Sequence, residues 1–119
     1  MTLRLTLWLL GLMLKRARLK NPRFRDTLAE LRRMDWGIAT EDLSIARHYR
    51  MTPAGIDSAK GLPGNLDLEL RFRDAAAALA FLKRPTQRAF LDGMLNGQLR
   101  LVGDSRDLTR LQKLLKYLR

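Results

Sequence analysis

Hydrophobic and polar residues alternate most regularly along residues 66–73. Charged side chains separate the apolar positions Leu66, Leu68, Leu70 and Phe72. Because successive side chains of a strand point to opposite faces, this pattern predicts a strand with one buried and one solvated face. Similar alternation predicts strands over residues 34–39, 43–51 and 98–102, and at most a short edge strand over residues 56–60.

Apolar residues recur at helical spacing in the segments around these strands. Residues 21–33 place Phe24 and Leu28 on one helix face, with Asn21 as the capping residue and Pro22 in the first turn. Two more helices are predicted over residues 74–83, capped by Asp74, and over residues 85–96, opened by Pro85. A leucine-rich helix follows Asp104 to the end of the chain.

The order of these elements is a helix, about four strands, two helices, one strand and one helix. Strands segregated from helices are typical of an α+β fold. We therefore expect about five strands in a mainly antiparallel sheet, with the helices packed on one face. The 119 residues suffice for one core, in a domain over residues 21–119 that is preceded by an N-terminal apolar and basic helix over residues 1–20.

That N-terminal segment contains the apolar run LTLWLLGLML at residues 5–14. Ten residues are half of the ~20 that span a bilayer, and basic residues follow at once without a small-residue cleavage site. We therefore expect the segment to be retained and not to span a membrane. A helix that is apolar nearly all round needs burial, either against the domain, against a second copy of the chain in a homodimer, or as an anchor at a membrane surface.

The charge is concentrated in the same part of the chain. The formal net charge is +11, and residues 1–33 hold nine Lys and Arg against two acidic residues. Such an excess favours anionic partners. We expect residues 1–33 to make peripheral contact with an anionic membrane rather than nucleic acid, because the basic cluster at residues 47–50 lies in no recognisable nucleic-acid-binding motif.

Residues suited to catalysis are scarce. The chain has no cysteine and one histidine, His48, and it lacks a glycine-rich phosphate-binding loop. No nucleophile stands near His48 at a useful spacing, and no cluster of metal ligands occurs. We therefore expect no enzyme activity, no catalytic residue, no metal and no cofactor, in a protein located in the cytoplasm or peripherally at the inner membrane surface.

The second half of the chain carries an ordered series of motifs. The strand LDLELRF is followed by the helices DAAAALAFLKR and PTQRAFLDGMLNG, and then by GQLRLVGD, which leads into LTRLQKLLKYL. In this order and spacing, residues 66–118 resemble the C-terminal half of the sterol carrier protein type two domain. The resemblance implies a five-stranded sheet and helices that enclose an apolar tunnel for sterol-like, fatty acyl or isoprenoid lipids.

Motif position then implies which residues line such a tunnel. The expected lining residues are Leu79, Phe81, Leu82, Phe90, Leu91, Met94, Leu95, Leu99 and Leu101, with Leu111 and Leu115 closing one end. The function that follows is non-enzymatic binding or transfer of a hydrophobic ligand, as an accessory factor in lipid or quinone metabolism. Two alternatives stay open: an adaptor module whose tunnel is filled, with residues 1–20 as plug or interface, and a basic nucleic-acid-binding protein.

Overall fold

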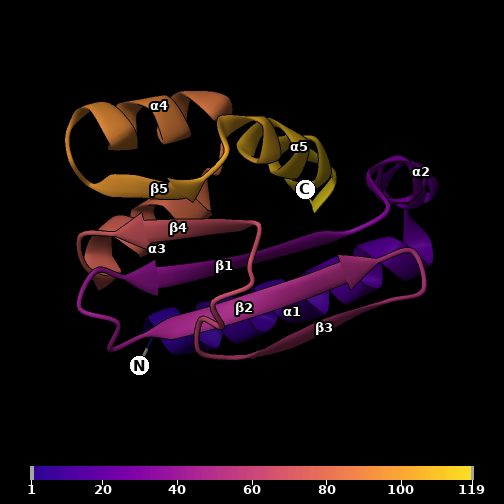
Figure 1. Cartoon of the computed structure of the whole chain (residues 1–119), viewed down its shortest axis with the longest axis horizontal. Helices are drawn as coiled ribbons and strands as arrows, with labels where there is room; N and C mark the ends of the chain where they lie inside the picture. Colours follow the sequence, from indigo (N-terminus) through magenta and orange to yellow (C-terminus); the bar gives the residue numbers. More distant parts are fainter. Residues whose placement is uncertain (1, 119) are drawn as a thin grey trace.

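A five-stranded sheet with the order β3–β2–β1–β4–β5 organises residues 2–118, the part of the chain that the computed structural model describes (Figure 1). Neighbouring strands are antiparallel except β1 and β4, which run parallel. The strands are β1 (Met34–Thr40), β2 (Ala46–Thr52), β3 (Gly55–Lys60), β4 (Leu68–Phe72) and β5 (Leu99–Gly103).

The helices follow the predicted order. They are α1 (Thr2–Lys20), α2 (Pro22–Leu31), α3 (Ala75–Lys83), α4 (Gln87–Leu95) and α5 (Ser105–Leu115), with a short 3-10 helix η1 (Lys116–Leu118) after α5. Figure 1 shows α1 behind the strands β2 and β3, and α3 behind the β4 end of the sheet. The expected α+β fold, with helices on one face of a mainly antiparallel sheet, is confirmed.

Side-chain caps begin the helices as the sequence suggested. Asn21 accepts hydrogen bonds from the N–H groups of Arg23 and Phe24, and Asp74 accepts one from Ala77. The second of the paired helices differs from its prediction: α4 begins at Gln87, because the Thr86 hydroxyl, and not Pro85, provides the cap.

Two strand predictions also need correction. β2 begins at Ala46 and not at residue 43, because Leu43 adopts a φ of 60° in the turn that follows β1. β4 begins at Leu68 and not at residue 66, because Leu66 belongs to the loop beside Gly37 on the other face of the sheet. The edge strand predicted over residues 56–60 is β3, which pairs with β2 along its whole length.

The helix-covered face of the sheet carries the large core side chains. Trp36 and Tyr49 are fully buried there, with ring centroids 4.7 Å apart. The loop that joins β3 to β4 crosses the other face at Gly37, where an added Cβ would lie 2.4 Å from a methyl group of Leu62. Both faces of β1 are therefore buried, which explains its continuous burial pattern.

Helix α1 belongs to this core. Its buried residues fall on one face, and they are Leu3, Leu7, Leu10, Gly11, Leu14 and Ala17. Gly11 allows a close approach to β3, because a Cβ at this position would lie 3.1 Å from the Ser58 hydroxyl. The N-terminal segment therefore packs against the sheet over most of its length.

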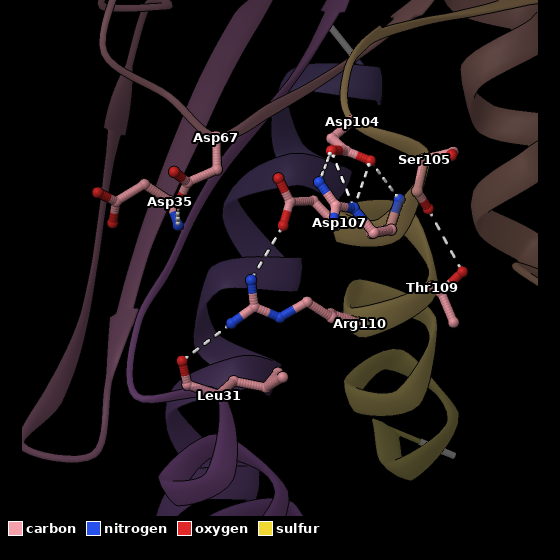
Figure 2. A network of polar contacts seen from close by, with 9 residues as sticks. Leu31, Asp35, Asp67, Asp104, Ser105, Asp107, Thr109 and Arg110 are labelled. Carbon is pink, nitrogen blue, oxygen red and sulfur yellow. Dashed lines mark hydrogen bonds and ion pairs between the residues drawn. The ribbon is translucent and has the colours of Figure 1, made fainter.

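The C-terminal helix is connected to α2 through a polar network (Figure 2). Arg110 on α5 donates one hydrogen bond to Asp107 and another to the main-chain carbonyl of Leu31, each 3.0 Å long. The second bond adds a side-chain donor at the end of α2 to a carbonyl that also accepts from the N–H of Arg33. In the same figure, Asp104 accepts hydrogen bonds at the start of α5.

Candidate apolar ligand site

An apolar cavity of about 290 Å³ lies between α1, the helix-covered face of the sheet and the C-terminal ends of α3 and α5. Its walls are almost entirely hydrocarbon. The lining residues are Thr6, Leu9, Leu10, Met13, Trp36, Ile38, Leu70, Phe81, Leu82, Lys83, Pro85, Leu115 and Leu118.

The strand period builds the floor of this cavity. Trp36 and Ile38 are alternate residues of β1, so they point to the same face, and Ile38 lies directly opposite Leu70 of β4. Thr6, Leu10 and Met13 are spaced by four and three residues, which places them on one flank of α1 above that floor. One flank of α1 therefore forms a side wall of the cavity above the sheet.

The polar atoms of the wall are few. The Thr6 hydroxyl donates to the carbonyl of Thr2 within α1 at 2.9 Å. The Trp36 indole N–H is buried and has no acceptor among residues 2–118. Leaving such a donor unpaired costs about 1–3 kcal/mol.

Three of the predicted lining residues meet at this cavity. Phe81 and Leu82 come from α3, and Leu115 comes from α5. The residues predicted on α4 lie elsewhere: Leu91, Met94 and Leu95 are 50%, 39% and 77% exposed.

The remaining predicted residues are part of the packing between helices and sheet. Phe90 is buried against Phe81, with ring centroids 4.5 Å apart. Leu99 and Leu111 are buried in the core, and Leu79 and Leu101 are partly buried against it.

The sequence pattern missed the contributions of α1 and β1 to the cavity. Leu10, Trp36 and Ile38 lie outside the motif series of the second half, which was the source of the predicted lining. The signals that would have found them are the spacing of Leu3, Leu7 and Leu10 in the N-terminal run and the alternation in β1.

The outer side of α1 is a second apolar feature. We call it the α1 stripe; its residues are between 42% and 62% exposed, and they are Leu5, Trp8, Leu9, Leu12, Met13 and Leu19. Leu9 and Met13 belong to the stripe and also line the cavity, so the stripe passes the cavity rim. No helix within residues 2–118 has the length and apolar character to cross a membrane.

The basic cluster at residues 47–50 does not converge on one surface. Arg47 and Tyr49 point to the helix-covered face, while His48 and Arg50 point to the opposite face. His48 is engaged at 2.9 Å with the main-chain oxygen of Gly61, and Arg50 forms an ion pair with the buried Asp35. Within residues 2–118, no group of three or more His, Cys, Asp or Glu side chains is placed to hold a metal ion.

The sequence matches no protein-family model and no curated protein. Solved structures do match. The ubiquinone synthesis protein UbiJ-SCP2 aligns over 97% of this chain and 96% of its own, with 13% identity and a TM-score of 0.71. Sterol carrier protein 2 from Yarrowia lipolytica, in its apo form, aligns over 92% and 88%, with 16% identity and a TM-score of 0.52.

A third likeness is to a part of a larger protein. The stereoselective inverting sec-alkylsulfatase Pisa1 from Pseudomonas sp. aligns with 76% of this chain and with 14% of its own length, with 14% identity and a TM-score of 0.56. Together, the likenesses confirm at the level of the fold the resemblance that residues 66–118 suggested.

Proposed function

For this chain with the sterol carrier protein 2 fold, we propose the binding of a single-chain lipid in the cavity beneath α1. The protein would hold or transfer this ligand without changing it chemically. The observation that carries the proposal is the cavity itself: an apolar space on the helix-covered face of the sheet, whose rim is shared with an exposed apolar stripe.

The chemistry of the wall favours a hydrocarbon ligand. Each methylene moved from water into such a wall contributes about 0.8 kcal/mol before ordering costs are subtracted. The volume of about 290 Å³ lies just below the roughly 300–1,000 Å³ of small-molecule sites, which suits one acyl or isoprenoid chain better than a bulky ligand. The names of two structural neighbours, a ubiquinone synthesis protein and a sterol carrier protein, agree with a lipid of this kind.

The α1 stripe suggests how such a ligand reaches the cavity. Leu9 and Met13 are at once exposed and part of the cavity wall, so a lipid that leaves a membrane at the stripe can enter without crossing water. Helix α1 contains no acidic residue, and Lys15, Arg16 and Lys20 follow the apolar part. This composition is typical of a helix that lies on an anionic membrane surface.

The test is native mass spectrometry of the full-length protein, followed by extraction and identification of any lipid released. Leu82→Trp is the informative variant, because Leu82 is half-buried in the cavity wall and an indole there would fill the space. Leu91→Trp is the matched control, since Leu91 is half-exposed on α4 and outside the wall. We expect wild type and Leu91→Trp to carry or take up lipid in a one-to-one complex, and Leu82→Trp to lose it.

Two results would contradict the proposal. The first is lipid binding that Leu82→Trp leaves intact in a folded protein. The second is an empty wild-type protein that also rejects a fluorescent fatty acid. In that second case, the α1 stripe would favour the alternative function of an adaptor that docks on a partner through this helix, and the same spectra would report whether a dimer forms.

A further inference from the structure

A second, larger hollow lies at the N-terminal end of α1, separate from the apolar cavity described above, which we call the lipid cavity. We call it the corner pocket; it is open to solvent and has a volume of about 520 Å³. It is lined by Arg4, Leu5, Leu7, Trp8, Leu43, Ser44, Ile45, Ala46, Arg47, Lys60 and Gly61. None of these residues lines the lipid cavity.

Three cations from three elements meet in this pocket. Arg47 of β2 and Lys60 of β3 are direct partners in the antiparallel ladder, so two positive side chains stand opposite each other on the same face of the sheet. Like charges in this position destabilise a sheet. Arg4 of α1 lines the same pocket and donates a 3.0 Å hydrogen bond to the carbonyl of Ser44.

No carboxylate of residues 2–118 forms an ion pair with any of these three cations. The half-buried Arg47 donates to the Ser58 hydroxyl. Two carboxylates follow β1 in the adjoining turn, but both are engaged: Glu41 pairs with Arg100, and Asp42 accepts hydrogen bonds from Thr40 and Ser44. The pocket therefore holds an excess of positive charge that its own fold does not neutralise.

The remaining wall is apolar and partly exposed. Leu5, Trp8 and Leu43 are 56%, 47% and 52% exposed around the pocket. An inorganic anion would leave these side chains in water, whereas an anion that carries a hydrocarbon chain would cover them.

We propose that the corner pocket binds the phosphate group of an anionic amphiphile. Arg4, Arg47 and Lys60 contact the phosphate oxygens, and the chain lies over Leu5, Trp8 and Leu43. Guanidinium and ammonium groups together match the several acceptors and the charge of a phosphate ester better than those of a single carboxylate. The ligand can be a free lipid phosphate or a headgroup within a membrane, since the recognised chemistry is the same.

Trp8 provides the readout, because it lines the pocket and is half-exposed. The probes are monomeric lysophosphatidic acid, a neutral monoacylglycerol, inorganic phosphate, and phosphatidylcholine vesicles with and without phosphatidic acid. We expect a blue shift of tryptophan emission with monomeric lysophosphatidic acid, and its loss in Trp8→Phe. Arg47→Gln and Lys60→Gln should each weaken binding about tenfold or more, as expected for a lost charge-assisted hydrogen bond.

Lys113→Gln and Arg84→Gln are the matched controls, because both residues are exposed and lie outside the corner pocket. A shift with vesicles but not with monomeric lysophosphatidic acid would overturn the pocket and leave only surface contact with a membrane. Equal losses in Arg47→Gln and Lys113→Gln would overturn it as well, as would inorganic phosphate or the neutral monoacylglycerol binding as tightly as lysophosphatidic acid.

This inference does not depend on the lipid cavity. Leu82→Trp fills the cavity and leaves the corner pocket intact, so the Trp8-dependent shift should persist in that variant, measured against Leu82→Trp/Trp8→Phe. Failure of the cavity proposal and failure of the corner pocket are therefore separate outcomes.

Discussion

The hydroxyl of Tyr49 donates a 2.6 Å hydrogen bond to the main-chain carbonyl of Leu7, and so connects strand β2 to helix α1. Both partners are buried. Because this bond is a buried polar contact between the sheet and the helix that covers it, Tyr49→Phe should lower the free energy of unfolding by about 1 kcal/mol. Urea unfolding measures the loss. In Tyr49→Phe, hydrogen exchange should be faster at the backbone amides of α1 than at those of β4.

The same tyrosine predicts a dependence on alkaline pH. Burial raises the pKa of Tyr49, and the nearby charge of Arg47 opposes that shift in part. The folded state thus holds the phenolic proton more tightly than the unfolded chain, in which the pKa of tyrosine is about 10. The contribution to stability is constant below about pH 10 and is lost as the pH rises further.

Urea unfolding of wild type and Tyr49→Phe from pH 8 to pH 11 tests this linkage. We expect the wild type to lose stability faster than the variant above about pH 10, while the two curves run parallel below it. Parallel curves over the whole range would mean that the Tyr49 phenol titrates as it does in the unfolded chain.

Gly103 should resist substitution by any larger residue. Its φ is 128°, and an added Cβ would lie 2.6 Å from the main-chain oxygen of Asp67. Gly103→Ala should therefore destabilise the protein by about 1–3 kcal/mol through backbone strain, with a further cost from the contact. Gly64→Ala is the control, because nothing lies within 4 Å of a Cβ there; a comparable loss in both variants would contradict this account.

The ion pairs of the buried Asp35 should contribute more to stability than an exposed ion pair does. Its carboxylate is 2% exposed and accepts hydrogen bonds from Arg33 and Arg50. Since both arginines would lose a charged acceptor at a buried site, Asp35→Asn should cost about 1–3 kcal/mol. Asp92→Asn, which removes the exposed pair with Arg88, should change stability by about 0–0.5 kcal/mol.

The sequence predicted best those elements whose pattern is local. The alternation from Leu68 to Phe72 reports one buried face of β4, and the caps Asn21 and Asp74 act within their own helices. The parallel pairing of β1 with β4 joins residues about thirty positions apart, so no local period encodes it. Likewise, alternation alone suggested that β2 begins at residue 43, because the turn conformation of Leu43 does not disturb the pattern of side chains.

The candidate site was predictable in part for the same reason. Phe81, Leu82 and Leu115 were expected from motif position, and they meet at the cavity. A tunnel over α4 was expected too, but Leu95 is 77% exposed, since a helix with apolar residues on several sides can bury only one side. Helix α1 is apolar nearly all round, so its sequence did not predict which residues are buried. In the structure, one face of α1 is buried against the sheet and the other is exposed.

The buried and exposed faces of α1 should differ in what they contribute to stability. Leu14 is fully buried in the core, while Leu12, two residues earlier, is 42% exposed on the α1 stripe. Leu14→Ala should lower the free energy of unfolding by about 2–5 kcal/mol, because it leaves a cavity in packed surroundings. Leu12→Ala should change it by about 0.5 kcal/mol or less. A single cooperative transition that shifts in Leu14→Ala would establish that α1 unfolds with the rest of the domain, whereas equal and small effects would show that α1 is a separable segment.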